Sequence, residues 1–112
     1  MKKTTAAILL ALAASSAQAY AIRGTPSCGQ WIEGRSNARG SADGSPEAWS
    51  ALTNQMWYLG YLSGVAVGSK SDFLRNLDND SIFVYTDNYC SANPLKSLAE
   101  AGVALALEAG KR

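Results

Sequence analysis

The 112-residue sequence contains no histidine and only two cysteines. Catalytic devices that pair a serine or cysteine with an imidazole base are therefore excluded, and zinc sites lose a common nitrogen ligand. Nine acidic residues face ten basic ones, and the basic residues form no cluster, so we expect no nucleic-acid partner. The sequence predicts a protein that is not an enzyme and holds neither a metal nor a cofactor.

The beginning of the chain has the pattern of a cleavable export signal. Lys2 and Lys3 precede an uncharged, largely apolar stretch over residues 4–14, and Ala17-Gln18-Ala19 matches the small-x-small motif of signal peptidase. We therefore expect cleavage after Ala19 and a periplasmic protein. The mature chain, residues 20–112, is predicted to be one small domain that keeps no stable membrane anchor.

The two cysteines are predicted to form a disulfide. An oxidising compartment permits the bond, and Cys28 and Cys90 are too far apart in the sequence for a typical redox pair. Closing a loop of 62 positions stabilises a domain by about 4 kcal/mol in the chain-entropy model. This is a large share of the stability that a domain of this size has.

Capping residues and apolar spacing predict four helices and hence an all-α, four-helix domain whose disulfide joins the first helix to the third. Ser27 begins the first helix, Ser45-Pro46 begins the second, and Asn93-Pro94 begins the last. The third contains residues 82–86, whose β-branched and aromatic side chains also suit a strand, although their spacing favours a helix. Residues 34–44 are rich in glycine and are expected to form an exposed loop.

The second predicted helix is unusually apolar. From Ala48 to Ser69 it carries no charge, and it has apolar residues on more than one side. We therefore expect it to be the central, buried helix. Its uninterrupted apolar part is about 13 residues long, shorter than the roughly 20 that cross a bilayer.

Three glycines, Gly60, Gly64 and Gly68, recur at four-residue spacing in this helix, with Trp57 and Tyr61 beside them. They destabilise an isolated helix by roughly 2 to 3 kcal/mol relative to alanine. Close packing of another backbone would compensate for this cost. The partner is either the last helix of the same chain, which is also rich in small residues, or a second protein chain.

Several short motifs resemble a known family. They are a cysteine on the first helix, GYLSG at residues 60–64, YCSANP at residues 89–94 and an alanine- and leucine-rich last helix. Together, over residues 28–107, they resemble small exported proteobacterial proteins related to the Tai-type immunity proteins of type VI secretion. The resemblance implies an all-helical periplasmic protein, often a homodimer, that binds and blocks a cell-wall amidase.

The first functional hypothesis is therefore a non-enzymatic module that binds another protein, such as a secreted cell-wall hydrolase, with Trp57, Tyr58 and Tyr61 as aromatic anchors. The alternative is a small periplasmic chaperone of the HdeA type, which shares the helical architecture and the single disulfide. A third hypothesis is a small-ligand carrier whose pocket is lined by Trp31, Trp49 and Trp57.

Overall fold

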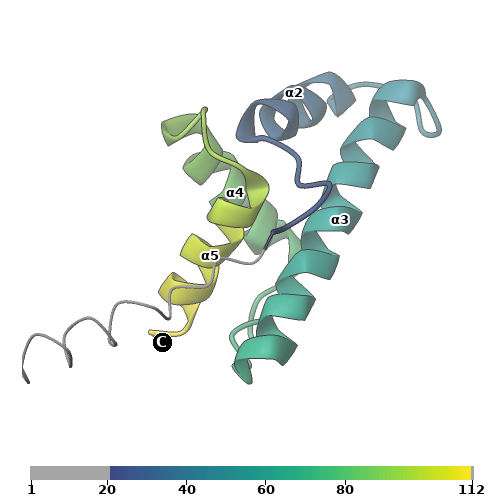
Figure 1. Ribbon diagram of the computed structural model, residues 1–112. Coiled ribbons are helices and arrows are strands. Elements are labelled where there is room, and N and C mark those ends of the chain that lie inside the picture. Colours follow the sequence, from purple (N-terminus) through teal and green to yellow (C-terminus); the bar gives the residue numbers. More distant parts are fainter. Residues whose placement is uncertain (1–20, 112) are drawn as a thin grey trace, which may run out of the picture.

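The computed structural model describes residues 21–111, which form four α-helices and no β-strand (Figure 1). The helices are α2 (Cys28–Ala38), α3 (Pro46–Ser69), α4 (Asn79–Ala92) and α5 (Leu98–Ala109). The predicted all-α fold is confirmed, and so is the disulfide between Cys28 of the first helix and Cys90 of the third. The expected signal peptide lies outside the described residues.

The four helices form a ring of contacts. α2 packs on α3, α3 on α5, α5 on α4, and α4 again on α2. In Figure 1 the long α3 runs along one side of the molecule, with α2 crossing near its upper end and α4 and α5 lying on the other side. The expectation that α3 is the central helix is therefore wrong, because its neighbours cover only its inner side.

Side-chain caps fix the point where each helix begins. Ser27 and Ser97 each form a capping box with the residue three positions further on, before α2 and α5. The side chains of Ser45 and Asp78 accept backbone N–H bonds at the starts of α3 and α4. Pro46 occupies the first turn of α3, as predicted from the sequence.

The loop expected over residues 34–44 is shorter than predicted. α2 continues to Ala38, and Gly34 is buried where a Cβ atom would lie 3.6 Å from the Cα of Ala51. This glycine therefore serves helix packing rather than a turn. Gly40 and Gly44, with φ angles of +75° and +78°, do belong to the connection, where such angles favour glycine.

The last helix begins later than predicted. Asn93 does not cap it but closes α4, where its side-chain Nδ2 donates to the carbonyl of Tyr89 at 2.9 Å. The chain then makes a turn in which Leu95 is 99% exposed, and α5 starts at Leu98 behind its own capping box. A cap followed by proline here marks a turn between helices.

The core fills the inside of the ring. Its largest fully buried side chains are Trp31, Tyr58, Leu62, Leu98, Thr86, Cys28 and Cys90. Residues 82–86 are helical, which confirms the prediction from their spacing, and Ile82, Phe83 and Thr86 are buried while Val84 is exposed. Most of the side chains in this segment therefore face the core, which accounts for its large apolar residues.

The segment before α2 is tied to the start of α5. The amide of Cys28 donates to the carbonyl of Lys96 at 2.8 Å, and the amide of Leu98 donates to the carbonyl of Pro26 at 2.9 Å. Ser27 and Ser97 thereby form an isolated antiparallel bridge. The two ends of the domain are held together by backbone hydrogen bonds as well as by packing.

Candidate protein-binding face

One side of α3 is left uncovered by the part of the chain that the structure describes. Trp49 and Met56 are each 60% exposed, Leu52 is 42% exposed, and Val67 is 80% exposed. At 3.6 residues per turn these side chains fall on one side of the helix, opposite the buried Tyr58. We call this surface the α3 face, and its residues are Trp49, Leu52, Thr53, Met56, Gly60, Ser63, Gly64 and Val67.

The three glycines do not contact the last helix. Gly60, Gly64 and Gly68 are all exposed, and a Cβ atom added at any of them would meet no atom of residues 21–111 within 4 Å. Packing of this strip against the last helix, the first of the two alternatives, is therefore wrong. Gly60 and Gly64 belong to the α3 face, and Gly68 lies at its edge.

The close approach between α3 and α5 depends on a different glycine. Gly102 of α5 is buried, and a Cβ atom there would lie 2.8 Å from Cε1 of Tyr61 and 3.2 Å from Cδ2 of Leu62. Gly102 belongs to the small residues expected on the last helix, but as a single glycine in an alanine-rich helix it does not stand out from Ala99 and Ala106. The repeated glycines of α3 gave a stronger but misleading signal.

The proposed aromatic anchors lie beside the α3 face rather than on it. Trp57 and Tyr61 stack with ring centroids 5.3 Å apart and are half-buried, and Trp57 also lies close to Gly24 of the N-terminal segment. Tyr58 is fully buried, and burial raises its pKa to about 12. The expectation that Tyr58 is an exposed anchor is wrong.

The three tryptophans do not share an environment. Trp31 is fully buried between α2 and α4, Trp57 is half-buried, and Trp49 is an exposed part of the α3 face. A ligand pocket lined by all three therefore receives no support from their placement. Trp49 is instead the largest side chain that the α3 face offers to a partner.

The α3 face is uncharged, and its polar groups are already paired. The hydroxyl of Thr53 donates to the carbonyl of Trp49, and that of Ser63 donates to the carbonyl of Leu59, both at 2.8 Å. If a partner covered this surface, both hydroxyl protons would keep their acceptors.

Within residues 21–111 we found no helix that is both long and apolar enough to cross a membrane.

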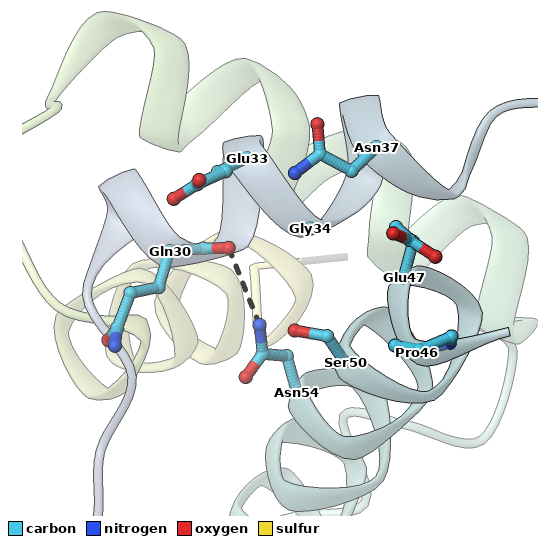
Figure 2. Close-up of a pocket in the computed structure, with 8 residues that line it drawn as sticks. All are labelled: Gln30, Glu33, Gly34, Asn37, Pro46, Glu47, Ser50 and Asn54. Carbon is cyan, nitrogen blue, oxygen red and sulfur yellow. Dashed lines mark hydrogen bonds between the residues drawn. The ribbon is translucent and has the colours of Figure 1, made fainter.

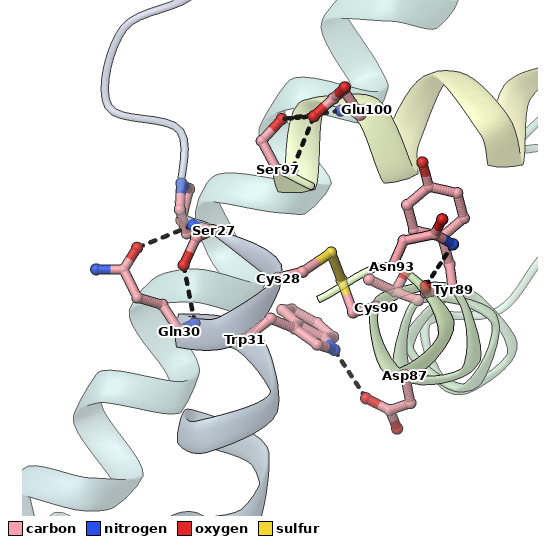
Figure 3. The surroundings of a disulfide bond; sticks show 12 residues. Ser27, Cys28, Gln30, Trp31, Asp87, Tyr89, Cys90, Asn93, Ser97 and Glu100 are labelled. Atoms are coloured by element: carbon pink, nitrogen blue, oxygen red, sulfur yellow. Dashed lines mark hydrogen bonds between the residues drawn. A yellow bond between two sulfur atoms is a disulfide. The ribbon is translucent and has the colours of Figure 1, made fainter. Parts of the chain in front are cut away.

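A disulfide and an ion pair link α2 to α4 behind this face. Figure 3 shows the disulfide and the hydrogen bond from Trp31 to Asp87 beside it. Asp87 of α4 accepts hydrogen bonds from Trp31 Nε1 at 2.7 Å and from Arg35 Nε at 3.0 Å and Nη2 at 2.8 Å. The hydrogen bonds to Asp87 raise the pKa of Arg35. No local pattern singles out Asp87, because it lies more than 50 positions along the chain from both Trp31 and Arg35.

A polar cleft separates α2 from the beginning of α3 (Figure 2). It has a volume of about 390 Å³ and is lined by Gln30, Glu33, Gly34, Asn37, Pro46, Glu47, Ser50 and Asn54. Asn54 Nδ2 donates to the backbone carbonyl of Gln30 across it, at 3.4 Å. Glu33 and Glu47 are both exposed, and the cleft is therefore an open, acidic groove between two helices.

No cluster of three potential metal ligands is present in the described part of the chain. The carboxylate of Asp78 caps α4 instead, where it accepts a hydrogen bond from the amide of Ser81 at 2.7 Å. Comparison with known proteins found no match among family models, characterised proteins or solved structures.

Proposed function

We propose that this chain is an exported, non-enzymatic protein that works by binding another protein through the α3 face. The observation that carries this proposal is the exposure of Trp49, Met56 and Val67 along one side of a single helix. Contiguous apolar surface of this kind marks interaction sites in soluble proteins. Tryptophan and methionine are also among the residues enriched in protein interfaces.

The cross-links between helices support the same function. The disulfide links α2 to α4, and the Arg35–Asp87 pair links the same two helices about two turns further along α2. α3 packs against α2 and α5 along its inner side, so its outer side is presented in a fixed shape. A preorganised surface loses little conformational entropy on binding, which favours affinity.

The finer form of the proposal is a periplasmic immunity protein that blocks a secreted effector such as a cell-wall hydrolase. It is supported by the resemblance described for residues 28–107 and by the disulfide, since such bonds persist in oxidising compartments. The inhibitor would cover the effector's active site and would need no chemistry of its own. Mass spectrometry of the periplasmic protein should find an N-terminus at Tyr20.

The binding function can be tested by photo-cross-linking in living cells. A photoreactive amino acid at Trp49 or Met56 should yield an adduct with a protein partner after illumination. The matched control is Val84, which is 54% exposed on α4, outside the α3 face. Equal yields from the face and the control, or no adduct from either face position, would contradict the proposal.

A second candidate function is an acid-activated chaperone of the HdeA type, and one observation favours it. Asp78 and Glu100 stabilise the first turns of α4 and α5, and their hydrogen bonds lower both pKa values. Protonation in acid would weaken both helix starts and loosen apolar surface. If this function is correct, the protein should suppress light scattering by an aggregating client at about pH 2 to 3 but not near neutrality.

A further inference from the structure

We propose that the polar cleft between α2 and α3 is one end of a groove that binds a short oligosaccharide, with amino sugars preferred over uncharged ones. The groove runs beside the α3 face and shares only Thr53 with it. This second binding site therefore does not depend on the proposed function. The continuity of the groove, the chemistry of its lining and an aromatic ring at its far end support the assignment.

Two neighbouring cavities form the groove. Beside the polar cleft lies a second cavity with a volume of about 330 Å³, and Gln30 and Asn54 line both. The second cavity is also bordered by residues 24–26, which precede α2, and by Trp57 of α3. Along α3 the groove extends from Glu47 to Trp57, about 15 Å along the helix axis. Each cavity has a volume within the range of small-molecule sites.

Planar polar groups and hydroxyls line the polar cleft. Figure 2 shows Glu33 and Asn37 of α2 on one side and Ser50 and Asn54 of α3 on the other. Within the described residues, the side chains of Glu33, Asn37 and Ser50 form no hydrogen bond to the rest of the chain. Their donors and acceptors are therefore available to a ligand. A sugar ring carries several hydroxyl groups that both donate and accept, and it can pair with such groups on both sides.

The two amides at the centre of the groove are held in place. Gln30 Oε1 accepts a hydrogen bond from the amide of Ser27 at 2.9 Å, and Asn54 Nδ2 donates to the carbonyl of Gln30 at 3.4 Å. These bonds leave the NH₂ group of Gln30 and the side-chain oxygen of Asn54 free. The centre of the groove therefore offers both a donor and an acceptor, which suits a hydroxyl group.

Trp57 provides an aromatic surface at the far end of the groove. Its ring stacks on that of Tyr61, with the two planes inclined by only 7°. This stacking holds the half-buried indole in one orientation, and part of the indole lines the second cavity. The C–H groups on the face of a sugar ring are apolar and pack well on an aromatic ring. Polar groups followed by such a ring match the two kinds of surface that a sugar presents.

The lining disfavours other classes of ligand. In the two cavities, Trp57 and the rings of Pro26 and Pro46 are the only purely hydrocarbon or aromatic side chains among the described residues. A lipid or an apolar peptide would therefore bury little apolar surface. No lysine or arginine lines the groove, and Glu33 and Glu47 would repel a phosphate group. The same two carboxylates would attract the ammonium group of an amino sugar.

Nuclear magnetic resonance of the isotope-labelled protein tests the site directly. Titration with the trimer of glucosamine should shift the side-chain amide signals of Gln30 and Asn54 and the indole signal of Trp57. The indole signal of Trp49 should not move, because this side chain lines neither cavity. We expect a dissociation constant on the order of 1 mM, since an open groove covers a ligand only in part.

The choice of ligand provides a second test. The glucosamine trimer should bind about three-fold more tightly than chitotriose, its uncharged N-acetyl form, because exposed ion pairs add little affinity. Glucose phosphate should not bind. Spermidine, a linear polyamine without hydroxyl groups, is the control for charge alone. If spermidine binds as tightly as the trimer, or chitotriose does not bind, the groove recognises charge and the saccharide assignment is overturned.

Substitutions locate the site. Asn54→Ala should raise the dissociation constant for chitotriose about five-fold, because it removes an acceptor from the centre of the groove. Glu33→Gln should weaken only the binding of the glucosamine trimer, since it removes a charge and keeps the shape. The matched control is Asn88→Ala, which removes an exposed amide from α4. Trp57→Phe should weaken the binding of both trimers, because the aromatic surface becomes smaller.

The melting temperature of each variant separates lost contacts from unfolding. Affinities that stay unchanged in folded Asn54→Ala and Trp57→Phe would overturn the inference. So would the absence of shifts with either trimer at about ten times the expected dissociation constant, or a shift of the Trp49 signal in place of the Trp57 signal. Photo-adducts from Trp49 or Met56 would in each case still support the proposed function, because neither residue lines the groove.

Discussion

Tyr58 of α3 and Thr86 of α4 form a hydrogen bond across the core, with 3.0 Å between their hydroxyl oxygens. The proton of Thr86 is directed to the carbonyl of Ile82 at 2.8 Å, because a carbonyl can only accept. Tyr58 is therefore the donor to Thr86. Both residues are fully buried, so this chain of two hydrogen bonds joins α3 to α4 within the ring of helices.

The direction of this hydrogen bond predicts unequal effects of two substitutions. Thr86→Val should destabilise the domain by about 1 to 3 kcal/mol, because it leaves the buried Tyr58 proton without an acceptor. Tyr58→Phe should cost about 1 kcal/mol, since Thr86 keeps its bond to Ile82. Urea unfolding of both variants measures these values. The double variant should be less destabilised than the sum of the two, and strict additivity would contradict the hydrogen bond itself. A cost for Tyr58→Phe that equals or exceeds that of Thr86→Val would contradict the assigned direction.

Removal of the disulfide should have the largest effect on stability. Cys28→Ala with Cys90→Ala should lower the free energy of unfolding by about 4 kcal/mol, because the bond closes a loop of 62 positions. The reduced wild-type protein should lose a similar amount of stability, but somewhat less than the double variant, because it keeps the two buried sulfur atoms. Since both cysteines are fully buried, the native protein should resist reductant until it is partly unfolded.

The carboxylate of Asp87 accepts hydrogen bonds from both Trp31 and Arg35, so removing it should break both interactions at once. Asp87→Ala should cost about 1 to 3 kcal/mol, because it leaves the indole N–H of the buried Trp31 and part of the Arg35 guanidinium without a partner. The tryptophan fluorescence spectrum of the folded protein should also change. Asp72→Ala, which removes an exposed ion pair with Arg75, is the matched control and should change stability by less than about 1 kcal/mol.

Glycine-to-alanine substitutions should have opposite signs on α3 and α5. Gly64→Ala should stabilise the monomer by up to about 1 kcal/mol, because its Cβ atom enters open space and alanine favours a helix. Gly102→Ala should destabilise it by about 1 to 3 kcal/mol, because its Cβ atom would press against Tyr61 and Leu62. Thermal melting at a low protein concentration separates these effects from association.

Two helix caps predict loss of stability in acid. Hydrogen bonds to the amide of Ser97 and to Lys96 lower the pKa of Glu100, and Ser81 lowers the pKa of Asp78. A carboxylate whose pKa is lower in the folded state contributes stability above its unfolded pKa near 4 and loses this contribution as pH falls through the folded pKa.

Asp78→Asn and Glu100→Gln should therefore flatten the dependence of melting temperature on pH below about pH 4. Asp43→Asn, in the loop before α3, is a suitable control and should leave that slope unchanged. An equally steep slope in the cap variants would show that other carboxylates control unfolding in acid.

Much of the fold could be predicted from local signals. Ser27 and the Ser45-Pro46 pair mark helix starts through backbone hydrogen bonds that the chain makes nearby. The pairing of the two cysteines followed from their number. The start of α5 could not be predicted in this way, because Asn93 and Ser97 are both plausible caps and only packing decides between them.

The candidate site was harder to predict, because its residues are apolar on a helix that is apolar all round. Periodicity places Trp49 and Met56 on one side of α3 but does not say whether that side faces a neighbour. Whether a neighbour covers that side depends on where α5 packs on α3. Gly102 permits this close approach, and the contact joins residues that are far apart in the sequence. The repeated glycines of α3 predict a close contact, but within the described residues that contact is made at Gly102 of α5 instead.

The bridge between Ser27 and Ser97 has a consequence for the timing of folding. The amide of Cys28 finds its acceptor in Lys96, so the first helix cannot complete its N-terminal contacts until nearly the whole chain has been synthesised. A nascent chain that ends before Lys96 therefore lacks both backbone hydrogen bonds of this bridge, and α2 gains them only when the start of α5 is in place.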